Sequence, residues 1–380
     1  MPRPLIAARW STFVMYLVNG FGFGAWTTAI APLKAELGLS SAQLSLALLS
    51  TTIGGIAALQ PASHLIQKLG GTGRATYVMS FAWVLALAVL VLPPNLPLLM
   101  VTCAFFGATI CLMDVAMNAH ASRVEIEWGA AIMSSFHAGF SLGGLLGTGF
   151  GALMLMLHVP THLLTVPASL VVAALSLVAV PYLGPGDTTK HESGPIFRLP
   201  EKSIALLAVI LSLCFLSEGA MADWSGIYLT SLGETPARAA AGYAAFSATM
   251  VMGRLVGDLI VRRLGRTLVI SAGAAFAAVG LVLATAFPVF WVIVGGFALV
   301  GAGLSNVVPC VFSAAAARAS SPAAGIAEVS SAGAGGFLSG PPLIGAVAAR
   351  HGMQAGIGVI AVAATLAALA ATRLKGEAKA

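Results

Sequence analysis

Three acidic residues, Asp114, Glu218 and Asp223, lie inside long apolar runs of this sequence of 380 residues. A charge at the centre of a bilayer costs roughly 2.5–3.5 kcal/mol on insertion scales, so such residues usually face a partner or a polar cavity. Burial disfavours the charged form of a carboxyl group, which allows it to bind a proton near neutral pH. Transport of a solute can be coupled to protons if the solute binds one protonation state preferentially. The alternative interpretation is that these acids only join helices through hydrogen bonds.

The spacing of the three acids along their predicted helices indicates which of them are the stronger candidates for proton binding. Asp114 and Asn118 are four residues apart and therefore share one face of a helix. Glu218 and Asp223 are five residues apart. This spacing places them about 140° apart around a regular helix, so both can face one cavity only if the helix breaks, for example at Gly219. We predict that Asp114 and Glu218 are the main proton-binding residues and that Asp223 is a second candidate.

Other polar and aromatic side chains offer weaker signals. His137 could relay protons or bind a solute, because histidine exchanges its proton near neutral pH, but it could equally be a hydrogen-bonded structural residue. Trp224 could stack on a ring-shaped solute, although aromatic residues in such runs more often only pack. We expect His64, His120 and His158 near the ends of spans.

The sequence offers no sign of a bound cofactor. No residue spacing indicates a metal site, and no phosphate-binding loop indicates that ATP drives transport. We therefore expect no cofactor and the proton as the coupling ion.

The composition predicts an all-α membrane protein. Apolar residues make up 58% of the chain and charged residues only 8%, whereas roughly 25% of a soluble protein is charged. Lipid must therefore cover much of the surface. The net charge of +6 fits basic cytoplasmic loops better than nucleic-acid binding.

A helix needs about 20 mostly apolar residues to cross a bilayer. Twelve segments meet this requirement, near residues 10–31, 43–65, 75–93, 97–119, 132–157, 162–183, 203–230, 238–261, 267–287, 290–315, 325–349 and 353–373. The polar stretch 184–202 divides them into an N-terminal bundle of six helices, residues 1–183, and a C-terminal bundle of six, residues 203–380.

The lysines and arginines predict the orientation. If the N-terminus is inside, 16 of the 19 fall in inside segments, and only Lys34, Arg238 and Arg350 fall outside. Cytoplasmic segments of membrane proteins carry such an excess of basic residues. We therefore expect both termini and the 184–202 linker in the cytoplasm.

A repeated loop motif points to a family. Predicted spans 8 and 9 are joined by Gly253-Arg254-Leu255-Val256-Gly257-Asp258 and Arg262-Arg263-Leu264-Gly265-Arg266. A basic residue, Leu and Gly recur 195 residues earlier, at Lys68-Leu69-Gly70. The C-terminal copy resembles the cytoplasmic loop motif of the major facilitator superfamily, whereas the N-terminal copy has Ser63-His64 where that motif has an acid.

The resemblance implies a gating role for this loop. Asp258 at the inner end of span 8 is expected to pair with Arg262 and Arg263, and we group Arg254 with them. Glu328, near the start of span 11, is expected to favour its own helix N-terminus, where the helix dipole attracts negative charge.

Further stretches resemble the same superfamily: the glycine-rich residues 137–147 and the run Gly340-Pro341-Pro342-Leu343-Ile344-Gly345. Residues 113–119 and 218–225 are similar to a poorly characterised subgroup of bacterial inner-membrane transporters, distantly similar to fucose permease-type sugar:proton symporters. The resemblance implies that helices 1, 4, 7 and 10 line a central cavity. Each carries a polar residue at depth: Asn19, Asp114 with Asn118, Glu218, and Asn306.

These observations favour a secondary transporter, not an enzyme, that works by alternating access. Proton symport of a small, polar, sugar-like metabolite is our first hypothesis. Proton-coupled efflux of an amphipathic compound is the alternative, because methionines also lie on the expected cavity helices, at Met15, Met113, Met117 and Met221, and on the adjacent span 8, at Met250. A non-transporting receptor or scaffold would not need acids at depth. We expect a monomer in the bacterial cytoplasmic membrane whose partners are a small solute and the lipid bilayer.

Overall fold

The computed structural model describes residues 3–129, 132–184, 201–318 and 322–374. The chain forms two compact units, Met1–Leu39 with Leu46–Ser193, and Ser40–Ser45 with Gly194–Ala380. Most of the predicted linker 184–202 lies outside the described residues.

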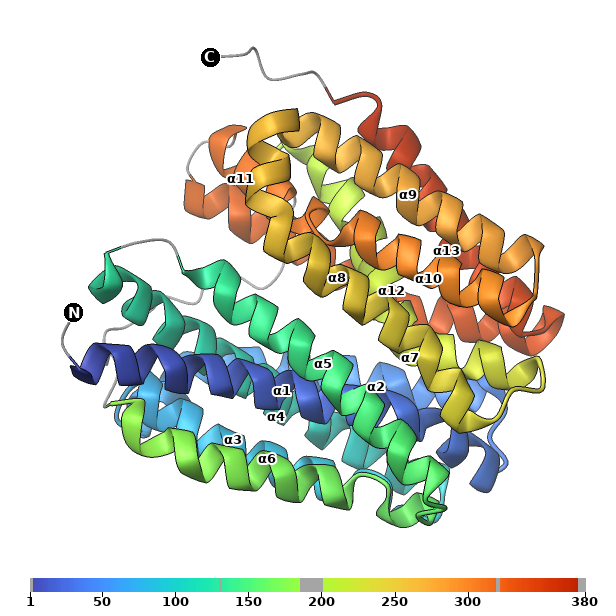
Figure 1. Ribbon diagram of the computed structural model, residues 1–380, viewed down its shortest axis with the longest axis horizontal. Coiled ribbons are helices and arrows are strands. Elements are labelled where there is room, and N and C mark those ends of the chain that lie inside the picture. The colour runs from blue at the N-terminus through green and yellow to red at the C-terminus, as the bar shows by residue number, and fades with distance from the viewer. Residues whose placement is uncertain (1–2, 130–131, 185–200, 319–321, 375–380) are drawn as a thin grey trace. The chain divides into compact units, whose positions relative to one another are not determined.

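Helices α1 to α6 belong to the first unit, apart from the first residues of α2. They are α1 (Arg3–Glu36), α2 (Ser41–Lys68), α3 (Thr72–Val89), α4 (Leu96–Trp128), α5 (Met133–Met156) and α6 (Val166–Ala179), with short 3-10 helices at Thr161–Leu163 and Val180–Tyr182. Helix α1 packs most extensively on α5, and α3 packs on α4 and α6 (Figure 1). Helix α1 also contacts α4, so its side chains can reach both α4 and α5.

The second unit contains seven helices in its described residues. They are α7 (Ala205–Ser231), α8 (Pro236–Leu264), α9 (Arg266–Ala286), α10 (Phe290–Leu304), α11 (Val307–Arg318), α12 (Pro322–His351) and α13 (Met353–Ala371). Helix α7 packs on α12, α13 and α8, and α9 packs on α10 and α13. Side chains of α7 can thus reach three neighbouring helices.

All twelve predicted spans contain helix. Eleven described helical segments are long and apolar enough to cross a membrane, and α8 is not among them. Its 29 residues extend about 43 Å, enough for a span. Arg238, Arg254, Asp258, Arg262 and Arg263 make it less apolar than the other helices.

The structure adds detail to the continuity of two predicted spans. The predicted span 290–315 is confirmed as one segment long and apolar enough to cross a membrane, Phe290–Ala315, and it contains a two-residue turn at Ser305 and Asn306, between α10 and α11. The Asn306 amide hydrogen-bonds to the Ser305 hydroxyl and to a carbonyl of α8, and such side-chain bonds compete with helical backbone bonding. Helix α7 continues through Gly219, so Glu218 and Asp223 remain about 140° apart around a regular helix.

Close packing of α1 on α5 depends on four glycines, Gly20 and Gly24 in α1 and Gly143 and Gly147 in α5. A Cβ atom at any of them would overlap a backbone carbonyl oxygen of the other helix, that of Phe21 in the case of Gly147. Small residues of this kind allow membrane helices to approach to backbone contact. The α1–α5 pair thereby provides a rigid frame for the polar residues of α1.

Candidate functional site

A chain of hydrogen bonds links Asp114 to the interior of the first unit. The Asn118 amide nitrogen donates to the Asp114 carboxylate Oδ1 at 2.9 Å and to the Asp114 carbonyl oxygen at 2.9 Å. The Tyr16 hydroxyl, from α1, donates to the Asn118 Oδ1 at 2.7 Å. Asp114 is exposed, whereas Tyr16 is 1% exposed. The carboxyl group is therefore accessible at one end and held in orientation at the other.

Tyr16 was missed by sequence reasoning. A tyrosine in an apolar run resembles ordinary packing, although Tyr16 lies one turn from Asn19 on the same helix face, which is the signal that could have found it. Its ring stacks on Phe136, with centroids 5.7 Å apart, and meets the His137 ring edge-on at 5.2 Å. His137, an exposed residue of α5, thus joins the Asp114 cluster through a ring contact.

Asn19 lies in α1 with its side chain 1% exposed. Neither its amide nitrogen nor its amide oxygen has a hydrogen-bond partner among the described residues. An unsatisfied buried polar group costs about 1–3 kcal/mol, so native proteins usually supply a water or a ligand. The buried amide of Asn19 therefore offers both a donor and an acceptor to an enclosed molecule such as water.

The second unit pairs Glu218 of α7 with Arg254 of α8. Arg254 Nη2 and Glu218 Oε1 are 3.7 Å apart, and the two side chains are 18% and 26% exposed. Arg254 lies ten residues before the end of α8, about 15 Å along the helix axis. The structure thus places Arg254, a predicted gate residue, next to Glu218, a predicted proton-binding residue.

Asp223 and Trp224 lie one to two turns further along α7. Asp223 is partly exposed and has no hydrogen bond or ion pair within the described ranges. The buried Tyr243 of α8, which hydrogen-bonds to Ser247, lies within electrostatic range of Asp223 and of the Glu218–Arg254 pair. Trp224 is fully buried, and its indole nitrogen is unpaired in the part of the chain that the structure describes. Tyr243 is therefore the shared neighbour of both acids.

Asn306 makes a contact between helices. Its amide nitrogen donates to the Gly253 carbonyl oxygen at 2.9 Å, and a Cβ atom at Gly257 would overlap its amide oxygen. The side chain therefore fastens the junction of α10 and α11 to α8, next to Arg254, and its amide nitrogen is already engaged.

The predicted gate residues are placed only in part. The side chain of Asp258 lies outside the described residues, and Arg262 and Arg263 are exposed at the end of α8. Glu328 does not act on its own helix N-terminus, because α12 begins six residues earlier and the macrodipole acts mainly within the first turn. Instead its Oε2 accepts a hydrogen bond from the Glu201 backbone nitrogen at 2.8 Å.

Among the described residues, no group of His, Cys, Asp and Glu side chains could hold a metal ion.

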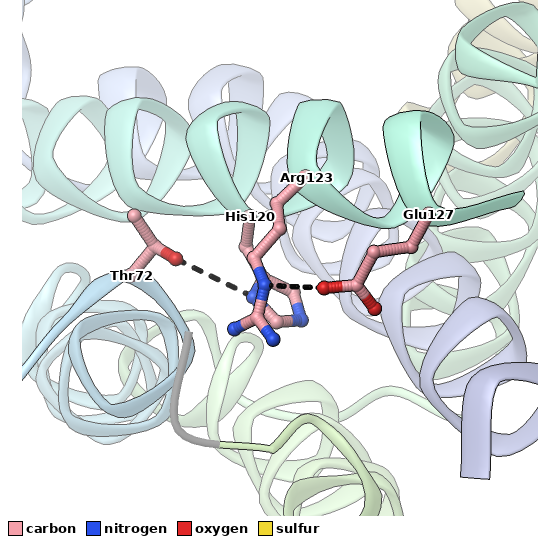
Figure 2. A network of polar contacts seen from close by, with 4 residues as sticks. All are labelled: Thr72, His120, Arg123 and Glu127. Carbon is pink, nitrogen blue, oxygen red and sulfur yellow. Dashed lines mark hydrogen bonds and ion pairs between the residues drawn. The ribbon is translucent and has the colours of Figure 1, made fainter. Parts of the chain in front are cut away.

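A separate polar network joins α3 and α4 (Figure 2). Thr72 Oγ1 and His120 Nδ1 are 3.5 Å apart, and the Arg123 Nε donates to the Glu127 Oε1 at 2.8 Å. His120 lies five residues before the end of the candidate span Leu96–Glu125, and its side chain is 1% exposed. Arg123 and Glu127 are 35% and 47% exposed, so their pair contributes about 0.3–0.5 kcal/mol. This network serves packing of the first unit.

Replacing Tyr16 by phenylalanine should weaken the first unit. The Tyr16→Phe variant leaves the Asn118 Oδ1 without its donor, which costs about 1–1.5 kcal/mol and lowers the thermal unfolding temperature in detergent. Tyr77→Phe is the matched control, because Tyr77 is 40% exposed and, among described residues, its side chain makes only a ring contact with Phe81. Equal unfolding temperatures for the two variants would contradict the importance of this hydrogen bond.

Comparison with known proteins gives consistent matches. The family model described as Major Facilitator Superfamily matches residues 12–327. An uncharacterised MFS-type transporter of Yersinia pestis is 35% identical, with 95% of this chain and 94% of the relative covered. An uncharacterised transporter of Sinorhizobium fredii is 31% identical, with 95% and 96% covered. The crystal structure of a nucleoside transporter, NupG (D323A mutant), has a TM-score of 0.76 at 11% identity, over 96% of this chain and 99% of that one. At that identity the structural likeness concerns the fold alone.

Proposed function

Because the chain belongs to the Major Facilitator Superfamily, we propose that it carries a small polar solute across a bacterial cytoplasmic membrane together with protons. It is a multi-pass, all-α membrane protein with the fold of these transporters, twelve spanning helices in two bundles of six. Secondary transporters of this kind alternate access to a site near the bilayer midplane. The direction of transport that we propose is import by symport.

The observation that carries the proposal is the environment of Asp114. It lies near the middle of α4, accessible on one side and bonded to Asn118 on the other. An ionised carboxylate only accepts hydrogen bonds, whereas a protonated one also donates. Protonation therefore changes which solute groups Asp114 can bind, and this difference in affinity is the physical basis of coupling.

A polar solute is favoured over an amphipathic one by the burial of the methionines. The five methionines that could have formed an apolar binding surface are all at most 2% exposed: Met15, Met113, Met117, Met221 and Met250. They therefore support efflux of amphipathic compounds less than their positions in the sequence suggested.

Orientation and assembly complete the proposal. The excess of lysine and arginine in the predicted inside segments supports cytoplasmic termini. We propose that a single chain, surrounded by lipid, contains the whole transport pathway and needs no cofactor other than the proton.

A screen of solutes against the purified protein in detergent tests the proposal. Sugars, polyols, nucleosides and amphipathic cations are added at pH 5.5 and 7.5, and thermal unfolding is followed. A polar solute at 100 times its Kd should stabilise the protein by about 2.7 kcal/mol, with tighter binding at pH 5.5 because protons and solute bind together. If only amphipathic cations stabilise the protein, efflux replaces symport. If no solute does, a receptor or scaffold is favoured.

A further inference from the structure

An open apolar groove of 330 Å³ lies between α1 and the end of α6 in the first unit. Its lining includes Ala7 and Val14 of α1 and Leu175 and Val178 of α6. Val178 is 71% exposed, so the groove is accessible from outside the bundle, where a membrane protein meets lipid. An acyl chain in a groove makes more van der Waals contacts than one on a flat surface, and such contacts decide association within a bilayer.

Two aromatic side chains with polar tips also line the groove, Trp10 of α1 and Tyr182 of the 3-10 helix that follows α6. Together with Ser11, they are the polar side chains of its lining. Tryptophan and tyrosine are enriched where acyl chains meet head groups, because their rings are apolar and their N–H and O–H groups are polar. Span 1 begins and span 6 ends on the predicted cytoplasmic side, so the two rings mark the cytoplasmic interface.

The groove continues from this interface toward the membrane interior. Val14 lies four residues after Trp10 in α1, about 6 Å along the helix axis. The lining is apolar at this deeper end and carries polar tips at the interface. An amphiphile has the same arrangement, with an apolar chain and a polar head group.

The interfacial end of the groove also lies next to a positively charged helix terminus. Helix α1 begins at Arg3, one turn before Ala7, and has no acid in its first turn. The sequence contains no acid before Glu36. The free N–H groups and the dipole of a helix N-terminus attract phosphate groups, and basic residues at a membrane surface attract anionic lipids. The charge at this end of the groove therefore suits an anionic head group.

We propose that this groove binds one molecule of an anionic phospholipid. An acyl chain lies along Val14, Leu175 and Val178, and the phosphate group lies at the first turn of α1, where the Trp10 indole and the Tyr182 hydroxyl can donate to lipid oxygens. The bound lipid fills the space between α1 and α6 and stabilises their packing. This lipid is distinct from the transported solute, so the site is independent of proton coupling.

Fluorescence quenching in vesicles tests the site. The purified full-length protein is reconstituted into phosphatidylcholine vesicles with increasing fractions of phosphatidylglycerol whose acyl chains carry bromine, which quenches an indole on contact. Trp10 is 59% exposed, and Trp291 at the start of α10 is 74% exposed and lies outside the groove. Comparison with Trp10→Phe and Trp291→Phe gives the contribution of each indole. Quenching of Trp10 should be half-maximal at about a tenfold lower lipid fraction than that of Trp291, a factor that corresponds to 1.4 kcal/mol.

Phosphatidylethanolamine with the same brominated chains is the comparison lipid. It has no net charge, so it should quench Trp10 and Trp291 at similar fractions. The difference between the two lipids then measures the contribution of the anionic head group.

Two pairs of variants examine the groove itself. Val178→Ser removes an apolar side chain from the lining, whereas Leu177→Ser removes one that is 59% exposed on α6 outside the groove. Ala7→Leu narrows the groove, and Ala174→Leu enlarges an exposed residue of α6 that does not line it. Val178→Ser and Ala7→Leu should each weaken quenching of Trp10 by brominated phosphatidylglycerol several-fold, and their controls should leave it unchanged. Because Val178 is exposed, its variant should fold even if Ala7→Leu does not.

Each of three results would overturn the inference. Equal quenching of Trp10 and Trp291 by phosphatidylglycerol would mean that the groove meets only ordinary bulk lipid. Equal quenching of Trp10 by the two lipids would contradict an anionic head group at the start of α1. Absence of quenching at Trp10 would mean that another part of the chain, such as residues 185–200, covers the groove.

Discussion

Asp114→Asn is expected to abolish accumulation of solute on a proton gradient while solute binding persists. Asparagine keeps the size of the side chain and can still bond to Asn118, but it cannot bind a proton. With a pH gradient of two units, one coupled proton supports roughly 100-fold accumulation, since each tenfold corresponds to 1.4 kcal/mol. The variant should reach only equal concentrations on both sides of the membrane, measured as uptake of labelled solute into proteoliposomes.

Glu218→Gln should likewise lose accumulation of solute on a proton gradient, because the second unit would then lack the carboxyl group that lies next to Arg254 and that we expect to bind a proton. Glu127→Gln is the matched control, since Glu127 is an acid of the same helix as Asp114 but is 47% exposed and pairs with Arg123. If Asp114→Asn and Glu218→Gln both still concentrate the solute on a proton gradient, neither acid couples transport to protons.

The second large effect is expected from packing in the first unit. Gly147→Leu would drive a side chain into the Phe21 carbonyl oxygen of α1, and backbone cannot move aside as a flexible side chain can. Overpacking of this kind costs about 1–3 kcal/mol and sometimes more. Thermal unfolding in detergent should show a large loss of stability.

Gly149→Leu is the control for this variant. Gly149 lies two residues further along α5, is exposed, and has open space where a Cβ would lie. It should therefore keep nearly the natural stability. Equal stability of the Gly147 and Gly149 variants would mean that α1 and α5 do not approach to backbone contact.

The helices were predictable because lipid imposes a strong pattern. Each span needs a long apolar run, and the polar links between runs mark the ends of helices. The break between α10 and α11 was not predictable, because the apolar run is continuous through Asn306. At this turn the Asn306 amide nitrogen donates a hydrogen bond to the carbonyl oxygen of Gly253, a residue 53 positions away on another helix. Hydrogen bonds between residues far apart in the sequence cannot be predicted from the local composition.

The residues of the candidate site were also predictable only in part. Asp114, Glu218 and Asp223 were predictable because an acid in an apolar run is costly and therefore conspicuous. Their partners were harder to identify. Asn118 follows Asp114 by one turn, whereas Tyr16 lies 102 positions before Asn118. Arg254 belongs to the loop motif in the sequence, but in the structure it lies next to Glu218 of α7. Sequence spacing predicts partners on one helix and not those across two.

Simultaneous measurement of solute and proton movement tests proton coupling most directly. The protein is reconstituted into liposomes that contain a pH-sensitive dye, and the most stabilising solute of the screen is added outside without an imposed pH gradient. We predict that the lumen acidifies as the solute enters, and that Asp114→Asn liposomes show no such acidification. Entry of solute through the natural protein with no change in lumenal pH would contradict proton coupling.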